Sequence, residues 1–325
     1  MARAGSLLAV RRLLPAHRAQ PYTLAEPPSP RTARVITKEN TAMLIDFRVR
    51  PPYKTNLTTS LYNKPAPSPD PTKQSIFLIG KERVPSAEAR SIELFMQEMD
   101  ETETERAVIM GRKADDYGSV DNDEIDELAR AYPGRFIPFA GVNPNLPGQV
   151  GEIERVAAMG FRGVGIDAGW LRRPLYHDDP VFDPIYVKCQ ELGMIVSLTS
   201  SFMLGPDLSY SEPCAIQRVA MKYPNMKIVV PHGCWPHVHA ALAVAIRCPN
   251  VYLMPDCYIY IDGFALSDEY IKAANTYLKY RILYASSYPV RSLSQCLRGW
   301  KSRGFTDEAL QNTLYDNAAR LLGEK

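Results

Sequence analysis

Two arginines at the end of an apolar run are the residues of this chain with the clearest chemical consequence. Arg48 and Arg50 follow residues 43–45 and stand two positions apart, so on an extended segment they point to the same face. A guanidinium stays protonated at physiological pH and has no lone pair, so it binds anions and cannot ligate a metal. Buried together, the pair needs a substrate carboxylate or phosphate, or else internal acids. The internal acids that could serve are Asp46, Asp167 and Asp256.

A histidine follows another apolar run. His232 stands between residues 227–231 and Gly233. Imidazole titrates near neutrality, which suits it to general acid–base chemistry. A lone histidine in such a position is also common as a hydrogen-bonded core residue. Both interpretations of His232 stay open at this point, and we prefer the catalytic one.

A repeating pattern of strands and helices must position these residues. Apolar runs of strand length occur at 43–47, 106–110, 136–142, 161–166, 194–199, 227–231, 250–255 and 281–285. Near-continuous apolar runs are typical of a parallel sheet that is buried on both faces. The helix-compatible segments between them include 152–159, followed by Gly160, and 183–189, which continues to Gly193. The alternation predicts an α/β fold, a (β/α)8 TIM barrel over residues 43–325.

A long segment separates the first two predicted strands. Its first part, about 51–85, is rich in Pro, Asn, Thr and Ser, and residues 87–100 have a helical pattern. Long loops at the carboxyl ends of barrel strands usually complete or cover the site. We therefore expect residues 51–85 to cover the site.

Several segments, in this order, resemble the amidohydrolase-related family that includes aminocarboxymuconate-semialdehyde and resorcylate decarboxylases. They are DFRVRPP (46–52), GVNPNLP (141–147), EIERVAAMGFRGVGID (152–167), KYPNMKIVVPHGCWP (222–236) and RILYASSYP (281–289). The resemblance runs from about residue 43 to the end and implies a metal-dependent-hydrolase-like barrel. Such proteins usually bind a divalent metal through histidines on the first and fifth strands and an aspartate on the eighth. A further histidine after the sixth strand acts as acid or base.

Carried onto this chain, the resemblance puts other residue types at every ligand position. The first-strand ligands fall on Arg48 and Arg50, the fifth-strand histidine on Thr199 and the eighth-strand aspartate on Ser287. Only the acid–base histidine is kept, as His232. The resemblance therefore implies the scaffold without its metal, and we expect no cofactor. Two arginine charges beside His232 would lower its pKa and favour the neutral imidazole.

Other residues near these positions have both a chemical and a structural interpretation. Thr199 and Ser287 could each form a hydrogen bond to the substrate. Ser287 could also be a nucleophile if His232 lay within reach, although a space-filling hydroxyl is the more common role for both residues. Asp167 could orient a base or pair with Arg48. The aromatic residues expected as pocket walls or packing residues are Tyr53 and Trp235.

A second possible metal site lies just after the sixth predicted strand. Its potential ligands are His232, Cys234, His237 and His239. The spacing matches no common zinc module, and the last two histidines, two apart at a helix start, should diverge. A site rebuilt from His232, Cys234 and Asp256 stays an alternative. Inert buried thiols are the more usual state of Cys234 and Cys257.

Composition is that of an ordinary globular protein. The chain has 325 residues, of which 46% are hydrophobic and 23% charged, and a net charge of +2. Residues 1–42 hold seven Lys or Arg and two Glu, against 31 basic and 34 acidic residues in the rest. The body thus lacks a basic excess, and no apolar run approaches the roughly 18–20 residues of a membrane span. We expect neither nucleic acid nor a membrane as partner.

The N-terminal residues and the cysteines bear on location. Residues 1–42 are expected to be a disordered or extended arm, with Pro-rich 20–32, although their arginines and leucines would also suit a mitochondrial transit peptide. Met43 is a second possible start. Six cysteines without a CxxC or framework spacing predict reduced thiols and a cytoplasmic protein.

Together these features predict a metal-independent, amidohydrolase-like enzyme that acts on a small carboxylated substrate. Arg48 and Arg50 would hold the anion and stabilise developing negative charge, and His232 would transfer the proton. Hydrolysis is preferred over decarboxylation or another C–C lysis. A non-catalytic ligand-binding or scaffold protein and a metalloenzyme with a relocated site are the alternatives. The sequence determines neither the substrate nor whether the chain forms a homo-oligomer.

A chain that begins at Met43 is expected to melt at nearly the same temperature as the full chain, because the first predicted strand begins there. Differential scanning calorimetry of both proteins measures the two midpoints. A drop of more than a few degrees, about 1 kcal/mol or more for a domain of this size, would mean that residues 1–42 pack on the barrel.

Overall fold

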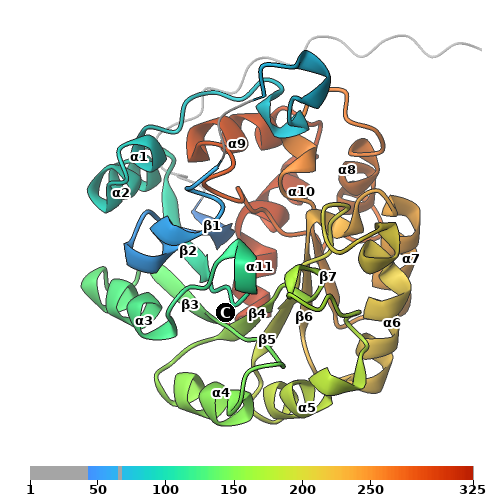
Figure 1. The fold of residues 1–325 in the computed structure, drawn as a ribbon. Helices are drawn as coiled ribbons and strands as arrows, with labels where there is room; N and C mark the ends of the chain where they lie inside the picture. The colour runs from blue at the N-terminus through green and yellow to red at the C-terminus, as the bar shows by residue number, and fades with distance from the viewer. Residues whose placement is uncertain (1–42, 65–67, 325) are drawn as a thin grey trace, which may run out of the picture. The chain divides into compact units, whose positions relative to one another are not determined.

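The predicted apolar runs form parallel strands in the computed structural model, which describes residues 43–64 and 68–324. The strands are β1 (Leu44–Val49), β2 (Thr104–Met110), β3 (Phe136–Gly141), β4 (Gly163–Ile166), β5 (Ile195–Leu198), β6 (Ile228–Pro231) and β7 (Val251–Met254). Each strand pairs with the next one in the sequence, so the sheet curls into a barrel (Figure 1). Every residue of β4, β5 and β6 is buried, which explains their unbroken apolar character. The expected arm, residues 1–42, lies outside the described residues.

The segment predicted as the eighth strand, 281–285, is not a regular strand. Leu283 N donates to Leu253 O of β7 (3.0 Å), and Phe47 N of β1 donates to Tyr284 O (3.1 Å). Tyr284 N turns away from the sheet and donates to Thr313 O (2.9 Å), which interrupts the ladder. The segment therefore closes the barrel between β7 and β1 through isolated bridges. The predicted barrel is confirmed, with seven regular strands among the described residues where eight were expected.

Helices surround the strands (Figure 1). They are α1 (Pro85–Glu88), α2 (Ile92–Glu101), α3 (Asn122–Ala131), α4 (Gln149–Ala158), α5 (Asp183–Glu191), α6 (Pro213–Lys222), α7 (Val238–Arg247), α8 (Asp268–Asn275), α9 (Leu293–Lys301), α10 (Asp307–Gln311) and α11 (Asn317–Leu321). The helices predicted at 152–159 and 183–189 are α4 and α5. The segment 87–100 is split into α1 and α2, because Arg90 has a left-handed backbone (φ 52°) and the Ser91 side chain caps α2.

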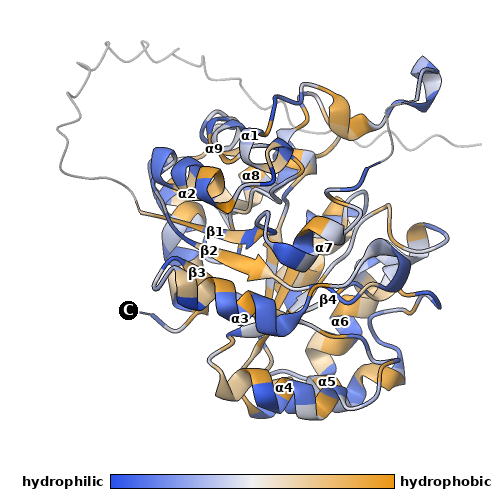
Figure 2. Cartoon of the chain, turned by 60° about the vertical axis from the view of Figure 1, so that its left-hand side comes forward, coloured by the Kyte–Doolittle hydropathy of each residue, from blue (hydrophilic) through white to orange (hydrophobic). Residues whose placement is uncertain are grey.

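Two apolar clusters stabilise the barrel. One joins the strands to the surrounding helices and includes Ile125 of α3 and Ile216 of α6. The other joins the strand residues Phe47 and Phe139 to Leu321 of α11, so the last helix packs against the barrel's second core. Figure 2 shows the hydrophobic strands and the mixed, partly hydrophilic surfaces of helices such as α3. Within residues 43–64 and 68–324, no helix is long and apolar enough to cross a membrane.

The segment between β1 and α1 contacts residues at the carboxyl ends of two strands. Tyr62 Oη donates to Arg50 O just after β1 (2.7 Å). The ring of Phe77 lies 6.0 Å from the ring of Tyr258, which follows β7. The segment expected to cover the site therefore reaches the end of the barrel where the predicted site residues lie.

Candidate active site

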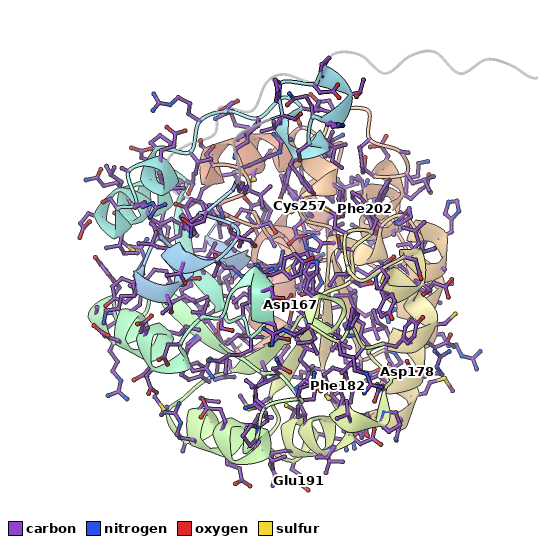
Figure 3. All side chains as sticks on the ribbon, in the orientation of Figure 1. Asp167, Asp178, Phe182, Glu191, Phe202 and Cys257 are labelled. Atoms are coloured by element: carbon purple, nitrogen blue, oxygen red, sulfur yellow. The ribbon has the colours of Figure 1, made fainter. Side chains whose placement is uncertain are left out.

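The carboxyl ends of the strands bring together residues that are far apart in the sequence, because parallel strands of a barrel end on the same side. The group consists of Arg48 and Arg50 from β1, Arg112 after β2, Asp167 after β4, Thr199 after β5, His232 after β6, Asp256 after β7 and Ser287 after the bridging segment. None of these residues is more than 6% exposed. In Figure 3, Asp167 and Cys257 lie inside the ring of helices, whereas Glu191 of α5 lies at its edge.

One guanidinium nitrogen of Arg48 contacts three of these groups. Arg48 Nη1 donates to Asp256 Oδ2 (3.0 Å) and to Ser287 Oγ (2.6 Å). It also lies 3.2 Å from His232 Nε2. The internal ion pair considered from the sequence is thus present for Arg48, with Asp256 as the partner.

Arg50 has no comparable partner. Its Nε and Nη2 are buried without a hydrogen bond among the described residues, and Asp167 Oδ2 lies 4.0 Å from Nη2. That oxygen is instead bound by Arg112 Nε at 3.1 Å. Burial, and next the charges of Arg48 and Arg112, lower the pKa of Arg50 well below its usual range. Three guanidinium groups here face the two carboxylates Asp167 and Asp256. Arg48 and Arg112 bind these carboxylates, so Arg50 is left without a hydrogen-bonded carboxylate among the described residues.

Sequence reasoning missed Arg112, although it follows the apolar run 106–110 after a single glycine. Its guanidinium carbon lies 4.6 Å from the centre of the Trp170 ring, a cation–π contact. Two glycines allow its backbone to approach β3: a Cβ on Gly141 would lie 2.6 Å from Arg112 N, and one on Gly111 only 2.2 Å from Gly141 N. The pair Gly111-Arg112 directly after a predicted strand was the feature of the sequence that could have identified Arg112 as a site residue.

The carboxylates are held ionised by this positive surrounding. Burial raises the pKa of Asp167, but Arg112, Arg50 and Arg48, with a hydrogen bond from Thr199, bring it down to about 2. Burial likewise opposes the ionisation of Asp256, and the contacts with His232 and Arg48 lower its pKa below the usual range. The hydroxyl of Thr199 thus helps to keep Asp167 ionised, and its expected hydrogen bond to a substrate stays a prediction.

His232 is neutral in this environment. Burial lowers its pKa first; Asp256 opposes this shift and Arg48 adds to it. Because Arg48 Nη1 can only donate, the facing Nε2 must carry the lone pair, which assigns the proton to Nδ1. Nδ1 lies 2.7 Å from Asp256 Oδ1, although the two atoms are not aligned for a hydrogen bond. The result is an imidazole that can accept a proton at Nε2.

Ser287 does not have the partner that a histidine-activated nucleophile needs. Its Oγ donates to Asp256 Oδ2 (2.8 Å) and accepts from Arg48 Nη1. Asp256 therefore lies between the serine and His232, whereas activation requires the histidine in the middle. The arrangement favours a structural role for the Ser287 hydroxyl, which links Arg48 and Asp256 through two hydrogen bonds.

Three residues that follow β6, β7 and the bridging segment have positive φ angles. His232, Cys257 and Ser287 adopt left-handed conformations with φ of 64°, 55° and 57°. Such conformations cost a non-glycine residue on the order of 1–3 kcal/mol and tend to cluster at functional sites. All three flank the Arg48–Asp256 contact, so the packing that sustains them also fixes that contact.

An aromatic cluster borders His232. The Tyr258 ring lies 5.6 Å from the His232 ring and 5.2 Å from that of Trp235. Phe202 and Phe264 pack on the same two aromatic residues, and Figure 3 shows Phe202 on the same side of the ring as Cys257. Trp235 thus lies beside the site, and Tyr258 is a wall residue that sequence reasoning missed.

Other predicted residues lie apart from this centre. Tyr53 Oη donates to Glu127 of α3 (2.7 Å), and Tyr53 packs against the apolar core, the second of the two roles expected for it. His237 Nε2 lies 3.3 Å from Leu208 O. Burial raises the pKa of Cys234 to about 12, which describes an inert thiol.

A metal ion does not fit these residues as they are arranged. His232, Asp256 and Cys257 place three potential ligand atoms within 4.8 Å of one another. Arg48 Nη1, however, already contacts the first two, and its positive charge would repel a divalent ion. Burial also raises the pKa of Cys257 to about 12, which disfavours the thiolate a metal would need. The group differs from the relocated site considered above, since Cys257 takes the place of Cys234.

A family model described as amidohydrolase matches residues 57–323. The chain belongs to the amidohydrolase family. The match begins after residues 46–52, so it does not include Arg48 or Arg50. Among curated proteins, none matches the chain.

Solved structures of similar fold extend this result. An uncharacterized TIM-barrel protein from Bordetella bronchiseptica is 32% identical, with a TM-score of 0.80 over 86% of this chain and 98% of that one. A 5-carboxyvanillate decarboxylase from Novosphingobium aromaticivorans, complexed with manganese, is 16% identical, with a TM-score of 0.61 over 88% of this chain and 97% of its own. A probable 2-pyrone-4,6-dicarboxylic acid hydrolase from Acinetobacter baumannii is 14% identical, with a TM-score of 0.59 over 87% and 99%. The last two show a shared fold.

Asp46 is a buried carboxyl group close to neutrality. Its Oδ1 accepts from Arg48 N (3.1 Å) and Ser286 N (3.0 Å), and its Oδ2 is buried without a partner among the described residues. Burial raises the pKa of Asp46 to about 7, against the hydrogen bonds from Ser286 and Arg48 that lower it. Asp46 therefore titrates within the physiological range and only partly offsets the arginine charges.

Asp46→Asn is expected to gain stability relative to the wild type as the pH rises. The substitution keeps the Oδ1 acceptor and removes the titration. Between about pH 4 and pH 7 the folded wild type holds a proton that the unfolded chain has lost, so Asp46 increasingly destabilises the fold across this window. The relative gain should approach about 4 kcal/mol.

Urea unfolding of both proteins at several pH values measures the gain, because the buried histidines contribute equally to both. The exposed substitution Asp116→Asn is the matched control and should show a constant difference. A constant difference for Asp46→Asn as well would mean that Asp46 is ionised throughout.

Proposed function

We propose that this member of the amidohydrolase family is an enzyme that acts on a small carboxylated substrate without a metal ion. The observation that carries the proposal is Arg50, whose Nε and Nη2 are buried without a partner while its nearest acid is bound by Arg112. A carboxylate could accept two charge-assisted hydrogen bonds from these nitrogens. The excess of positive charge in the group favours the same class of ligand.

The surroundings support a substrate with a planar body. Tyr258 and Trp235 offer aromatic faces beside His232, and aromatic rings pack well on such surfaces. Two proteins of similar fold are named for carboxylated rings, 5-carboxyvanillate and 2-pyrone-4,6-dicarboxylic acid. We therefore favour a ring carboxylate as the substrate class.

The proton transfer would be carried out by His232. A neutral imidazole is suited to accept a proton from water as the water oxygen attacks a carbonyl carbon, once Nε2 exchanges its contact with Arg48 Nη1 for one with the water. The proton would then pass to the departing oxygen or nitrogen, which completes hydrolysis of an ester, lactone or amide. Decarboxylation instead needs a proton donor, which the lowered pKa of His232 disfavours, so a C–C lyase is the second choice.

A non-catalytic binding protein is the alternative that a specific observation favours. Arg48 is neutralised by Asp256, and the two side chains are 3% and 0% exposed. A barrel that kept its fold while internal pairs replaced its chemistry would have such contacts. Turnover, measured below, separates this alternative from the enzyme.

We infer a cytoplasmic location. All six cysteines are free, and five of them are buried, as expected for a reducing compartment. Mitochondrial import through residues 1–42 is the alternative, and fluorescence microscopy of a C-terminally tagged chain distinguishes the two.

The purified protein is expected to carry well below one equivalent of zinc, manganese or iron per chain, because Arg48 Nη1 contacts the groups that would bind the ion. Inductively coupled plasma mass spectrometry measures the content, and thermal melting with and without a chelator tests its effect on the fold. About one metal per chain, with a melting temperature that falls on chelation, would contradict the proposal.

Arg50→Met and His232→Ala are expected to have separate effects. Arg50→Met removes a charge-assisted contact and should weaken carboxylate binding about 10- to 100-fold while the fold persists or gains stability. His232→Ala should leave binding intact and lower kcat about 10²- to 10⁴-fold. Titration calorimetry with ring carboxylates, followed by assays on those that bind, measures both effects.

The matched controls are Arg172→Met, which removes an exposed guanidinium, and His237→Ala, which removes a histidine outside the site. Both should behave as the wild type. If Arg50→Met unfolds the protein, Arg50 is a structural ion-pair partner and the anion site is wrong. Full activity in His232→Ala would remove the assigned role in proton transfer.

A further inference from the structure

A fourth buried arginine lies near the active site without an acidic partner. Arg291, four residues after Ser287, is 1% exposed. Its Nη2 donates to Ile79 O (2.7 Å), but its Nε and Nη1 are buried and have no hydrogen bond among residues 43–64 and 68–324. Within the same residues, no carboxylate pairs with it. A buried guanidinium with two unused N–H directions is costly unless an anion accepts from them.

Two lysines of the segment 51–85 add positive charge at the same place. Lys81 follows Ile79, whose carbonyl binds Arg291, by two residues. Burial, and next the charges of Lys64 and Arg291, lower the pKa of Lys81 to about 8. Glu88 opposes this shift, but its carboxylate is bound by Arg83 Nε at 2.9 Å. In the part of the chain that the structure describes, no carboxylate forms an ion pair with Arg291, Lys81 or Lys64.

The cluster adjoins the active site. Arg291 follows Ser287 by four residues, and the Ser287 Oγ donates to Asp256, the partner of Arg48. Phe77, two residues before Ile79, packs against Tyr258 of the aromatic cluster. Positive charge thus continues from the barrel centre to the segment that reaches over the strand ends.

We propose that Arg291, Lys81 and Lys64 form a second anion-binding site for an oxyanion, either a carboxylate or a phosphate. Two charge-assisted hydrogen bonds to Nε and Nη1 would satisfy Arg291, and the lysines would contribute charge. The oxyanion belongs either to the substrate held at Arg50 or to a separate phosphate. The site itself is independent of the proposed function, whereas its use by a substrate rests on it.

Titration calorimetry of the full chain with benzoate, isophthalate and inorganic phosphate tests the site. Lys81→Met is the main variant, because the Lys81 ammonium makes no hydrogen bond to the described residues and its loss leaves the Arg291–Ile79 contact in place. Arg291→Lys, which keeps the charge and removes the planar fork, is the second. Lys272→Met, on the exposed face of α8, is the matched control, and thermal melting verifies that each variant folds.

Two results would support the site. Isophthalate binding at least about tenfold tighter than benzoate, with the gain lost in Lys81→Met and in Arg291→Lys, assigns the site to a substrate's second carboxylate. Phosphate binding that Arg50→Met leaves unchanged and Lys81→Met weakens about tenfold assigns it to a separate phosphate.

Affinities for isophthalate and phosphate that are the same in Lys81→Met, Arg291→Lys and the Lys272→Met control would overturn the second site. Benzoate binding lost in Arg50→Met would in that case leave the proposed function standing. Benzoate binding unchanged in Arg50→Met would contradict the proposed function alone.

Discussion

The contact of Arg48 Nη1 with Asp256, Ser287 and His232 is the interaction on which the rest of the site depends. It joins the carboxyl ends of β1, β6, β7 and the bridging segment through one nitrogen. Because a guanidinium only donates, the contact determines where the imidazole proton lies, and it holds the serine hydroxyl on Asp256 instead of on the histidine. Removing the arginine would leave Asp256 as a buried, uncompensated charge. His232, Cys257 and Ser287, which have left-handed backbones, flank this contact.

The excess of positive charge in the group would couple the proposed binding of an anion to the proposed proton transfer by His232. Arg50 and Arg112 share the single carboxylate Asp167, and the buried Asp46 is near its midpoint at neutral pH. The same positive charges lower the affinity of His232 for protons. An anion arriving at Arg50 would offset part of this field, so the imidazole would become more basic when the site is filled. If Arg50 binds the proposed anion, His232 would be a stronger base in the presence of that ligand than in its absence.

Local patterns of apolar residues were sufficient to predict the barrel. The order of the segments that resemble the family was sufficient to predict which strand ends hold the candidate site residues. Apolar runs located β1 to β7, and Arg48, His232 and Asp256 were expected in one place because parallel strands end together. What could not be predicted depends on contacts between distant segments. The Tyr284 amide bonds to Thr313 and so interrupts the eighth strand; the choice of Asp256 for Arg48 depends on side-chain geometry across the barrel. Arg112 and Tyr258 resemble ordinary residues until the fold brings them beside Asp167 and His232.

The position of Arg48 also limits how this barrel can change by mutation. A divalent ion and a guanidinium cannot occupy the same space between His232 and Asp256, and a single Arg48→His exchange would leave Arg50 and Arg112 directed at the new ion. Each single substitution toward a metal site would therefore disturb the existing charge network without creating metal binding, whereas several substitutions together could create it. Such sign epistasis arises because the residues share one charge network and their effects are not additive. Libraries that vary Arg48, Arg50, Thr199 and Ser287 simultaneously would be required to cross this barrier.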